Sequence, residues 1–161
     1  MKVRFYQPSE IANLANIFTD AVRSIKPTDY SPTQLAAWAP IPPDFEYWHH
    51  RLCSLNVLIA EEDSKIMGFA TFESNGHLDH LYVHPEFQRR GVASALCHSI
   101  EQELLFLGIT RIFTDASITA RPFFEYAGFK MITSQTVQHA GISFVNYQME
   151  KHLPKQSPPA L

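Results

Sequence analysis

The spacing of apolar residues in the first third of the chain predicts one strand followed by helices. Apolar and polar residues alternate from Val3 to Tyr6, which favours a short strand. A helical period then begins near Ser9, which is a suitable N-cap residue. The proline-rich stretch from Lys26 to Asp44 cannot form one continuous helix. We expect a short helix around Gln34 to Trp38 inside that stretch, and a second helix from Asp44 to about Leu52.

The rest of the chain alternates β-rich runs with helical ones. Val57 to Glu61 and Ile66 to Phe72 are joined by a polar turn and predict a hairpin. His77 to Val83 predicts a further strand, and the helical face that follows from Arg90 ends at Gly108. We predict the remaining elements as a strand at Ile109 to Asp115, a short helix at Thr119 to Tyr126, and a closing hairpin of Phe129 to Gln138 and Ile142 to Met149.

This order, β-α-α-β-β-β-α-β-α-β-β, predicts a mixed α/β fold. The strand-helix-strand unit from His77 to Asp115 calls for two parallel neighbouring strands joined by a right-handed crossover. With 161 residues the chain suits one domain, which we place at 1–150, followed by a frayed tail at 151–161 that is rich in proline.

Composition narrows the functional classes. Hydrophobic residues make up 45% of the chain and charged residues 18%, which is typical of a globular protein. The net charge of −3, with no basic stripe, argues against nucleic-acid binding. No apolar run is long enough to cross a membrane, and the N-terminus lacks the apolar core of a signal peptide. We therefore expect a cytoplasmic protein, monomeric or homodimeric, with Cys53 and Cys97 as free thiols.

A histidine cluster raises the question of a metal. His77, His80 and His84 lie close together in the sequence, but no zinc-binding spacing accompanies them. On a strand, His77 and His80 would also point to opposite faces. We expect ordinary surface or partly buried histidines and no metal site.

A loop between a strand and a helix carries the most informative motif, Gln88-Arg89-Arg90-Gly91-Val92-Ala93. The first N–H groups of the following helix have no partner inside the helix, and with the helix dipole they form a site for an anion such as a pyrophosphate. Gly91 would let the backbone approach that anion closely. From the residues alone, an ordinary strand-to-helix turn with two solvated arginines remains equally possible.

These six residues resemble the Gln/Arg-x-x-Gly-x-Gly/Ala signature of the GCN5-related N-acetyltransferases (GNAT family). Leu81 to Pro85 before the loop and Phe123 to Phe129 after it resemble the flanking motifs of the family, in the same order. The predicted elements also match the family fold over nearly the whole chain. Within the family, the chain is most similar to YafP-type acetyltransferases. This similarity rests on Tyr30-Ser31-Pro32, Ala37-Trp38-Ala39, Asp115 to Ala120 and Pro122-Phe123-Phe124-Glu125.

The resemblance implies acetyl-coenzyme A (acetyl-CoA) as the acetyl donor. The pyrophosphate would be held by backbone N–H groups along the loop, namely those of Gln88, Arg89, Arg90, Gly91, Val92, Ala93 and Ser94. The backbone of Leu81, Tyr82 and Val83 would pair with the pantetheine arm as an added strand would. In the mixed GNAT-like sheet, the two parallel strands would splay apart and open the slot for that arm.

Acetyl transfer to an amine requires a base, because amines are protonated near neutral pH. Strict alternation places His77, Asp79, Leu81 and Val83 on one face of their strand. The family often carries a carboxylate there, so the resemblance implies Asp79 as the base, with His77 as second choice. An equally weighted alternative makes Asp79 a structural partner of a nearby cation or backbone group.

The chain departs from the family at the residue that protonates the leaving thiolate. The family usually has a tyrosine where this chain has Phe124, and Ser117 stands in place of a nearby asparagine. Tyr126 lies two residues further along the helix, about 200° away, and does not replace the missing hydroxyl. We expect Phe124 to pack on the pantetheine arm, with plain core packing as the alternative.

The acceptor side is expected to come from the Lys26 to Asp44 stretch. Tyr30 and Trp38 are the candidate pocket walls, with Trp48 as a third, and packing of a loop on the sheet is the alternative for each. The function predicted is N-acetylation of a small-molecule amine. The alternatives are a protein or peptide N-acetyltransferase and a non-catalytic coenzyme A-binding sensor.

Overall fold

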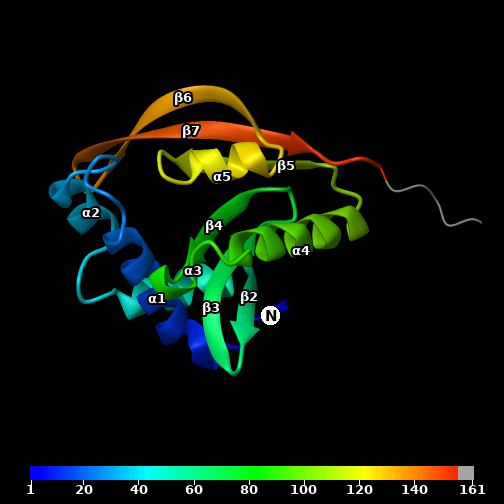
Figure 1. Cartoon of the computed structure of the whole chain (residues 1–161), viewed down its shortest axis with the longest axis horizontal. Helices are drawn as coiled ribbons and strands as arrows, with labels where there is room; N and C mark the ends of the chain where they lie inside the picture. The colour runs from blue at the N-terminus through cyan, green and yellow to red at the C-terminus, as the bar shows by residue number, and fades with distance from the viewer. Residues whose placement is uncertain (156–161) are drawn as a thin grey trace, which may run out of the picture.

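The computed structural model of the protein describes residues 1–155 and forms two antiparallel sheets with helices on both sides (Figure 1). The first sheet has the order β1-β2-β3-β4 and the second the order β5-β7-β6. The strands are β1 (Lys2–Phe5), β2 (Asn56–Glu62), β3 (Lys65–Phe72), β4 (Leu78–Val83), β5 (Arg111–Ser117), β6 (Lys130–His139) and β7 (Ile142–His152). The helices are α1 (Ile11–Arg23), α2 (Pro32–Trp38), α3 (Phe45–Cys53), α4 (Val92–Phe106) and α5 (Arg121–Tyr126), with short 3₁₀ turns at Pro8–Glu10 and Pro85–Phe87. The mixed α/β class is confirmed, and α2 is the short helix expected inside the proline-rich stretch.

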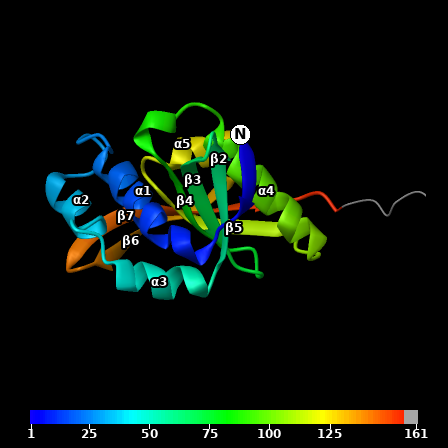
Figure 2. The ribbon, with the colours of Figure 1, turned by 90° about the horizontal axis from the view of Figure 1, so that it is seen from below.

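Helices cover both faces of the first sheet. Alternate residues of β2 separate into two hydrophobic cores, with Leu58 on the side of α4 and Ile59 on the side of α1 and α3. Figure 2 shows α1 and α3 side by side on their face of the sheet. Among residues 1–155, no helix has both the length and the apolarity needed to cross a membrane.

The first helix begins differently from the prediction. Ser9 does not cap it, because Ser9 lies inside the 3₁₀ turn that precedes α1. The Glu10 carboxylate instead accepts a hydrogen bond from the backbone N–H of Gln7 at 2.7 Å and pairs with Arg4 at 2.6 Å. The ion pair with a residue of β1 fixes the start of the helix, and a local capping pattern could not show it.

The two sheets meet through β4 and β5, which run parallel. They share a single parallel bridge, between His77 and Phe113, and then belong to separate sheets. The Thr114 hydroxyl adds one contact at this end by donating to the Leu78 carbonyl at 2.8 Å. The parallel pair and its splaying are therefore confirmed, and the separation of the strands positions the cleft described below.

The described structure extends beyond residue 150. Strand β7 continues to His152, and the buried Leu153 donates a backbone hydrogen bond to the Thr110 carbonyl at 2.6 Å. The start of the predicted frayed tail therefore belongs to the second sheet. Residues 156–161 of that tail lie outside the described residues.

Candidate acetyl-transfer site

A cleft of about 490 Å³ opens where β4 and β5 separate. One wall is formed by β4 and by α1 behind it, and the opposite wall by the end of β5, the start of α5 and β7. The segment from Trp38 to Trp48 covers one end. The residues of the β4 wall are Leu78, Asp79, His80, Leu81 and Tyr82, and those of the β5 and α5 wall are Thr114, Asp115, Ala116, Ser117, Ala120 and Phe124.

The loop before α4 has the backbone geometry of an anion site. Gly91 is the N-cap of the helix with φ of +80°, and Arg89 also has a positive φ, of +62°. Within the described residues, no backbone N–H from Gln88 to Ser94 donates a hydrogen bond to a protein acceptor. A side chain built on Gly91 would project into open space. The loop thus offers a row of free donors and a position that only glycine occupies without strain.

The two arginines of the loop differ in their surroundings. The Arg90 guanidinium pairs with Glu62 at 3.0 Å and lies 5.5 Å from the centre of the Phe87 ring. It therefore links the loop to the β2–β3 hairpin and is not simply a solvated arginine. Arg89 makes no hydrogen bond or ion pair with the described residues, which leaves its charge available beside the free N–H groups.

The predicted alternation along β4 is wrong because of a β-bulge. Thr71 pairs with His80 and Phe72 with Leu78, so Asp79 has no residue opposite it on β3. Beyond the bulge the faces exchange: Leu81 joins Leu78 on the α4 side, and Tyr82 packs on the opposite side. A bulge adds one residue to one strand and shifts every later side chain to the other face.

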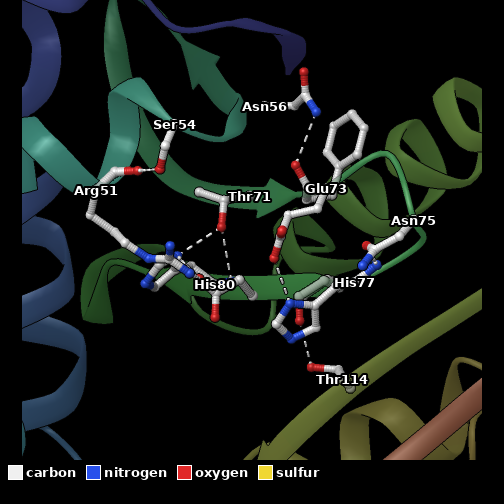
Figure 3. A network of polar contacts seen from close by, with 12 residues as sticks. Arg51, Ser54, Asn56, Thr71, Glu73, Asn75, His77, His80 and Thr114 are labelled. Carbon is white, nitrogen blue, oxygen red and sulfur yellow. Dashed lines mark hydrogen bonds and ion pairs between the residues drawn. The ribbon is translucent and has the colours of Figure 1, made fainter.

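His77 does not line the cleft. Its Nδ1 lies 2.8 Å from a Glu73 carboxylate oxygen, and its ring stacks on Phe113 with 5.1 Å between ring centres and 16° between planes. Figure 3 shows His77 turned toward Glu73, beside Thr114. The histidine therefore fastens the two sheets at their common end, and of the two base candidates only Asp79 lies in the cleft wall.

Asp79 forms an ion pair with Arg51 from α3. The Oδ2 atom accepts from the guanidinium and lies 3.5 Å from Nδ1 of His80. The other oxygen, Oδ1, accepts no hydrogen bond from a described residue. Oδ2 therefore is the partner of a nearby cation, as the structural alternative for Asp79 expected. Oδ1 remains free to face an acceptor.

His80 is a neutral histidine within the wall. Burial lowers its pKa to about 4. Thr71 Oγ1 accepts the His80 backbone N–H at 3.1 Å and lies 2.7 Å from Nδ1, an arrangement visible in Figure 3. A neutral ring can either accept from the threonine hydroxyl at Nδ1 or donate to it there, according to which ring nitrogen carries the proton. His77, His80 and His84 thus have separate partners, and among the described residues no group of three potential ligands could hold a metal.

Phe124 fits both interpretations of its role. Its side chain is 3% exposed and packs against Phe123 and Phe129, with ring centres 5.4 and 5.0 Å away, yet it also lines the cleft. Tyr126 is 85% exposed and does not line the cleft. Ser117 lines it, but its hydroxyl accepts the Ala120 N–H at 3.0 Å. Helix α5 therefore places no tyrosine hydroxyl in the cleft.

The expected acceptor walls do line the cleft. Tyr30 is buried, and its hydroxyl accepts the Ile118 N–H at 2.9 Å and donates to the Val145 carbonyl at 3.3 Å. Its ring packs edge-on against Trp38, with 5.3 Å between ring centres, and Trp48 is 4% exposed within the same aromatic cluster. These rings also pack the loop onto the sheets, which was the alternative interpretation. They therefore line the cleft and stabilise the loop at the same time.

Sequence reasoning missed several residues of the site. Arg51, Tyr47 and Asn146 contribute to the walls or to their ion pairs, although none belongs to a motif, and Asp115 lines the cleft although no role was predicted for it. Asn146, on β7, has a buried Oδ1 with no hydrogen-bond partner in the described structure. A cleft residue of this kind is recognised only once the sheets are assembled.

Comparison with known proteins finds similarity to N-acetyltransferases over most of the chain. A family model described as an acetyltransferase (GNAT) domain matches residues 27–151. The uncharacterized N-acetyltransferase YafP of Escherichia coli K12 is 38% identical over 149 residues, covering 92% of this chain and 94% of that protein.

Solved structures agree with these sequence matches. A GCN5-related N-acetyltransferase from Rhodopseudomonas palustris superposes with a TM-score of 0.90 and 32% identity, over 94% of this chain and 95% of that one. The fold is also similar to that of a PaiA N-acetyltransferase from Thermoplasma acidophilum in complex with coenzyme A, with a TM-score of 0.73 and 18% identity, over 94% of this chain and 99% of that one.

Proposed function

Because the chain belongs to the GNAT family of acetyltransferases, we propose that it transfers the acetyl group of acetyl-CoA to the amine of a small molecule. Family membership makes it an acetyl-CoA-dependent acetyltransferase. The small-molecule acceptor is the finer part of the proposal. One observation carries it: the cleft is covered at its acceptor end by a segment that is bonded to both sides of the molecule.

Four hydrogen bonds hold this cover, the segment from Asp29 to Trp48, in place. Tyr30 bonds to Ile118 and Val145 on the second sheet. The Asp29 carboxylate accepts the Thr119 hydroxyl at 2.8 Å. At its other end, the Ala39 carbonyl accepts from Nε of Arg23 on α1 at 2.8 Å. A peptide acceptor needs an open groove, so a cover fastened on both sides favours a small acceptor.

The donor side follows from the loop and the free strand edge. In the proposed complex, the backbone N–H groups of Gln88 to Ser94 hold the pyrophosphate, and the β4 edge at Leu81 to Val83 pairs with the pantetheine arm. Among the described residues, the hydrogen bonds between β4 and β5 lie near the His77 bridge and the Thr114 hydroxyl, so none reaches the Leu81 to Val83 edge. Ser117 and Phe124 form the opposite side of the slot.

The chemistry is a direct displacement. The amine nitrogen, once it has lost one proton, attacks the acetyl carbonyl carbon and forms a tetrahedral oxyanion. The oxyanion collapses, the carbon–sulfur bond breaks, and the second nitrogen proton passes to the departing thiolate or to solvent, which leaves the amide and coenzyme A. We assign the first proton to Oδ1 of Asp79, directly or through a water molecule. A backbone N–H of β4 supplies the donor for the oxyanion. No hydroxyl of α5 reaches the cleft, and a thiol with a pKa of about 8.5 leaves readily without an acid.

The test is release of coenzyme A thiol from acetyl-CoA with a panel of amines and a matched panel of peptides. Thiol release with small amines supports the proposal, and release with peptides alone contradicts the small acceptor. A non-catalytic sensor would bind acetyl-CoA by calorimetry and release thiol with neither panel.

The remaining parts of the proposal rest on composition. We propose a cytoplasmic protein, and Cys53 and Cys97 are free thiols, as is usual in that compartment. We further propose that it is monomeric or homodimeric and works without a metal cofactor. Size-exclusion chromatography with light scattering tests the oligomeric state, and activity after dialysis against a chelator tests the metal.

A further inference from the structure

The charges around the cleft have one sign. Its lining contains the carboxylates of Asp44, Asp79 and Asp115, the imidazoles of His80 and His139 and, among the described residues, no lysine or arginine. Arg51 approaches from behind, and its guanidinium is already paired with Asp79. A carboxylate or a phosphate on the acceptor would therefore meet like charge with no lysine or arginine in the lining to balance it, whereas an ammonium would meet opposite charge.

The accessible walls at the acceptor end are aromatic. Tyr47 is 53% exposed, and Trp38 and Tyr82 are half-buried. Each is fixed by a buried ring behind it: Tyr47 by Trp48 with 5.6 Å between centres, Trp38 by Tyr30, and Tyr82 by Phe18 with 4.8 Å between centres. Rings that are held in place offer stacking and cation–π surfaces at a low entropic cost.

Asn146 supplies a polar group that the protein does not use. Its Oδ1 is buried without a partner, and its amide makes no hydrogen bond to a described residue. The neighbouring polar groups are occupied: Ser117 accepts from Ala120, and Gln135 bonds to both Asp115 and Gln148. A buried, unpaired amide oxygen is costly unless a ligand donates to it, and an amine N–H is such a donor.

From these three observations we infer that the acceptor is an arylalkyl amine, an alkyl amine that carries an aromatic ring, without an acidic group, and that it is held between the aromatic walls with its nitrogen hydrogen-bonded to Asn146. The inference rests on the proposed function and names the substrate class of the same site. Asn146 acts here as a binding and positioning residue, while Asp79 keeps the proton-accepting role.

Four matched acceptors test the substrate class. They are 2-phenylethylamine, phenylalanine, 2-cyclohexylethylamine and spermidine, compared by kcat/KM at saturating acetyl-CoA. We expect 2-phenylethylamine to exceed phenylalanine by at least about a hundredfold, because phenylalanine adds a carboxylate beside three others. It should exceed the cyclohexyl amine and spermidine by about three- to tenfold, the range of an aromatic or cation–π contact.

The outcomes separate this inference from the proposed function. Equal or better use of phenylalanine, the cyclohexyl amine or spermidine overturns the inference and leaves the small-amine function standing. Thiol release with peptides only, or acetyl-CoA binding with no release for any acceptor, overturns both.

Variants of Asn146 test its position. Asn146→Leu should raise KM for 2-phenylethylamine by about five- to tenfold, the effect of one lost hydrogen bond, with KM for acetyl-CoA unchanged. Asn146→Asp keeps an accepting oxygen and should retain wild-type KM for the amine. Gln148→Leu is the control, since Gln148 lies on the same strand but does not line the cleft. An unchanged amine KM in folded Asn146→Leu, or the same rise in Gln148→Leu, overturns the role of Asn146.

Discussion

Replacing Gly91 by glutamate separates the anion site from the fold that carries it. Gly91 has φ of +80°, so any other residue there is strained by roughly 1–2 kcal/mol. A Cβ atom at this position meets no protein atom within 4 Å, so the new side chain starts from open space and can point away from the packed core. The variant should therefore fold, with a modest loss of stability, and place a carboxylate among the free N–H groups of the loop.

The loss of affinity can be worked out from the charges. With an effective dielectric constant of about 40 and a separation of about 6 Å, each pair of like charges costs roughly 1.4 kcal/mol. Two charges on a pyrophosphate then cost about 3 kcal/mol, or about a hundredfold in the dissociation constant. The bulk of the side chain adds to this effect. Titration calorimetry with coenzyme A measures the change directly.

Gly108 provides a matched control at the opposite end of α4. It has φ of +77° and equally open surroundings, so Gly108→Glu introduces the same strain and the same charge far from the loop. Gly108→Glu should lose somewhat more stability in urea than Gly91→Glu, because a carboxylate is disfavoured at the C-terminal end of a helix and favoured at the N-terminal end. Gly91→Glu alone should lose affinity. An unchanged dissociation constant in folded Gly91→Glu would refute the placement of the phosphate site.

Three further predictions concern the cleft walls. Asp79→Asn should lower turnover by about a hundredfold with coenzyme A affinity intact. His77 lies outside the cleft, so His77→Gln should leave turnover unchanged. Wild-type turnover of Asp79→Asn across a pH series would show that Asp79 is not the base. Phe124→Tyr should keep the fold and preserve or modestly raise the rate, while Phe124→Ala should weaken coenzyme A binding. If the tyrosine variant unfolds and the alanine variant binds coenzyme A normally, Phe124 packs only in the hydrophobic core and does not contact the cofactor. His80 has a pKa lowered from 6.5 to about 4, so the folded protein binds its proton less tightly than the unfolded chain, and stability should fall by about 3 kcal/mol as the pH drops from 6.5 to 4. Denaturant titrations of wild type and His80→Gln check this, and the same pH dependence in both would show that His80 is not responsible.

The parts of the site that depend on local backbone geometry could be predicted from the sequence. The loop around Gly91 is one such part. A glycine between a strand and an apolar helical face indicates both where the helix begins and where the backbone can take a positive φ. Tyr30 and Trp38 were also found, since aromatic residues in a proline-rich segment must pack against something. In each case the chemistry is contained within a few consecutive residues.

The parts that depend on pairing between distant segments could not be predicted. The bulge at Asp79 arises from its register against β3, and alternation within one strand cannot reveal it. The ion pair with Arg51 joins residues 28 positions apart. Asn146 enters the cleft only because the second sheet is set against α2 and the first sheet. The sequence therefore predicted the backbone geometry of the loop around Gly91 more completely than the residues that line the cleft.

The single bridge between His77 and Phe113 has a mechanical consequence. Two sheets that are joined at one end and separate at the other form a wedge. The edges of β4 and β5 that face each other in this wedge keep backbone N–H and C=O groups without a partner strand. A pantetheine arm inserted between them would act as the missing strand and turn two half-sheets into one continuous sheet. The co-substrate then serves as a removable structural element. Slow exchange of the β4 amides that point toward β5 should appear only while it is in place, whereas the amides bonded to β3 are protected in both states.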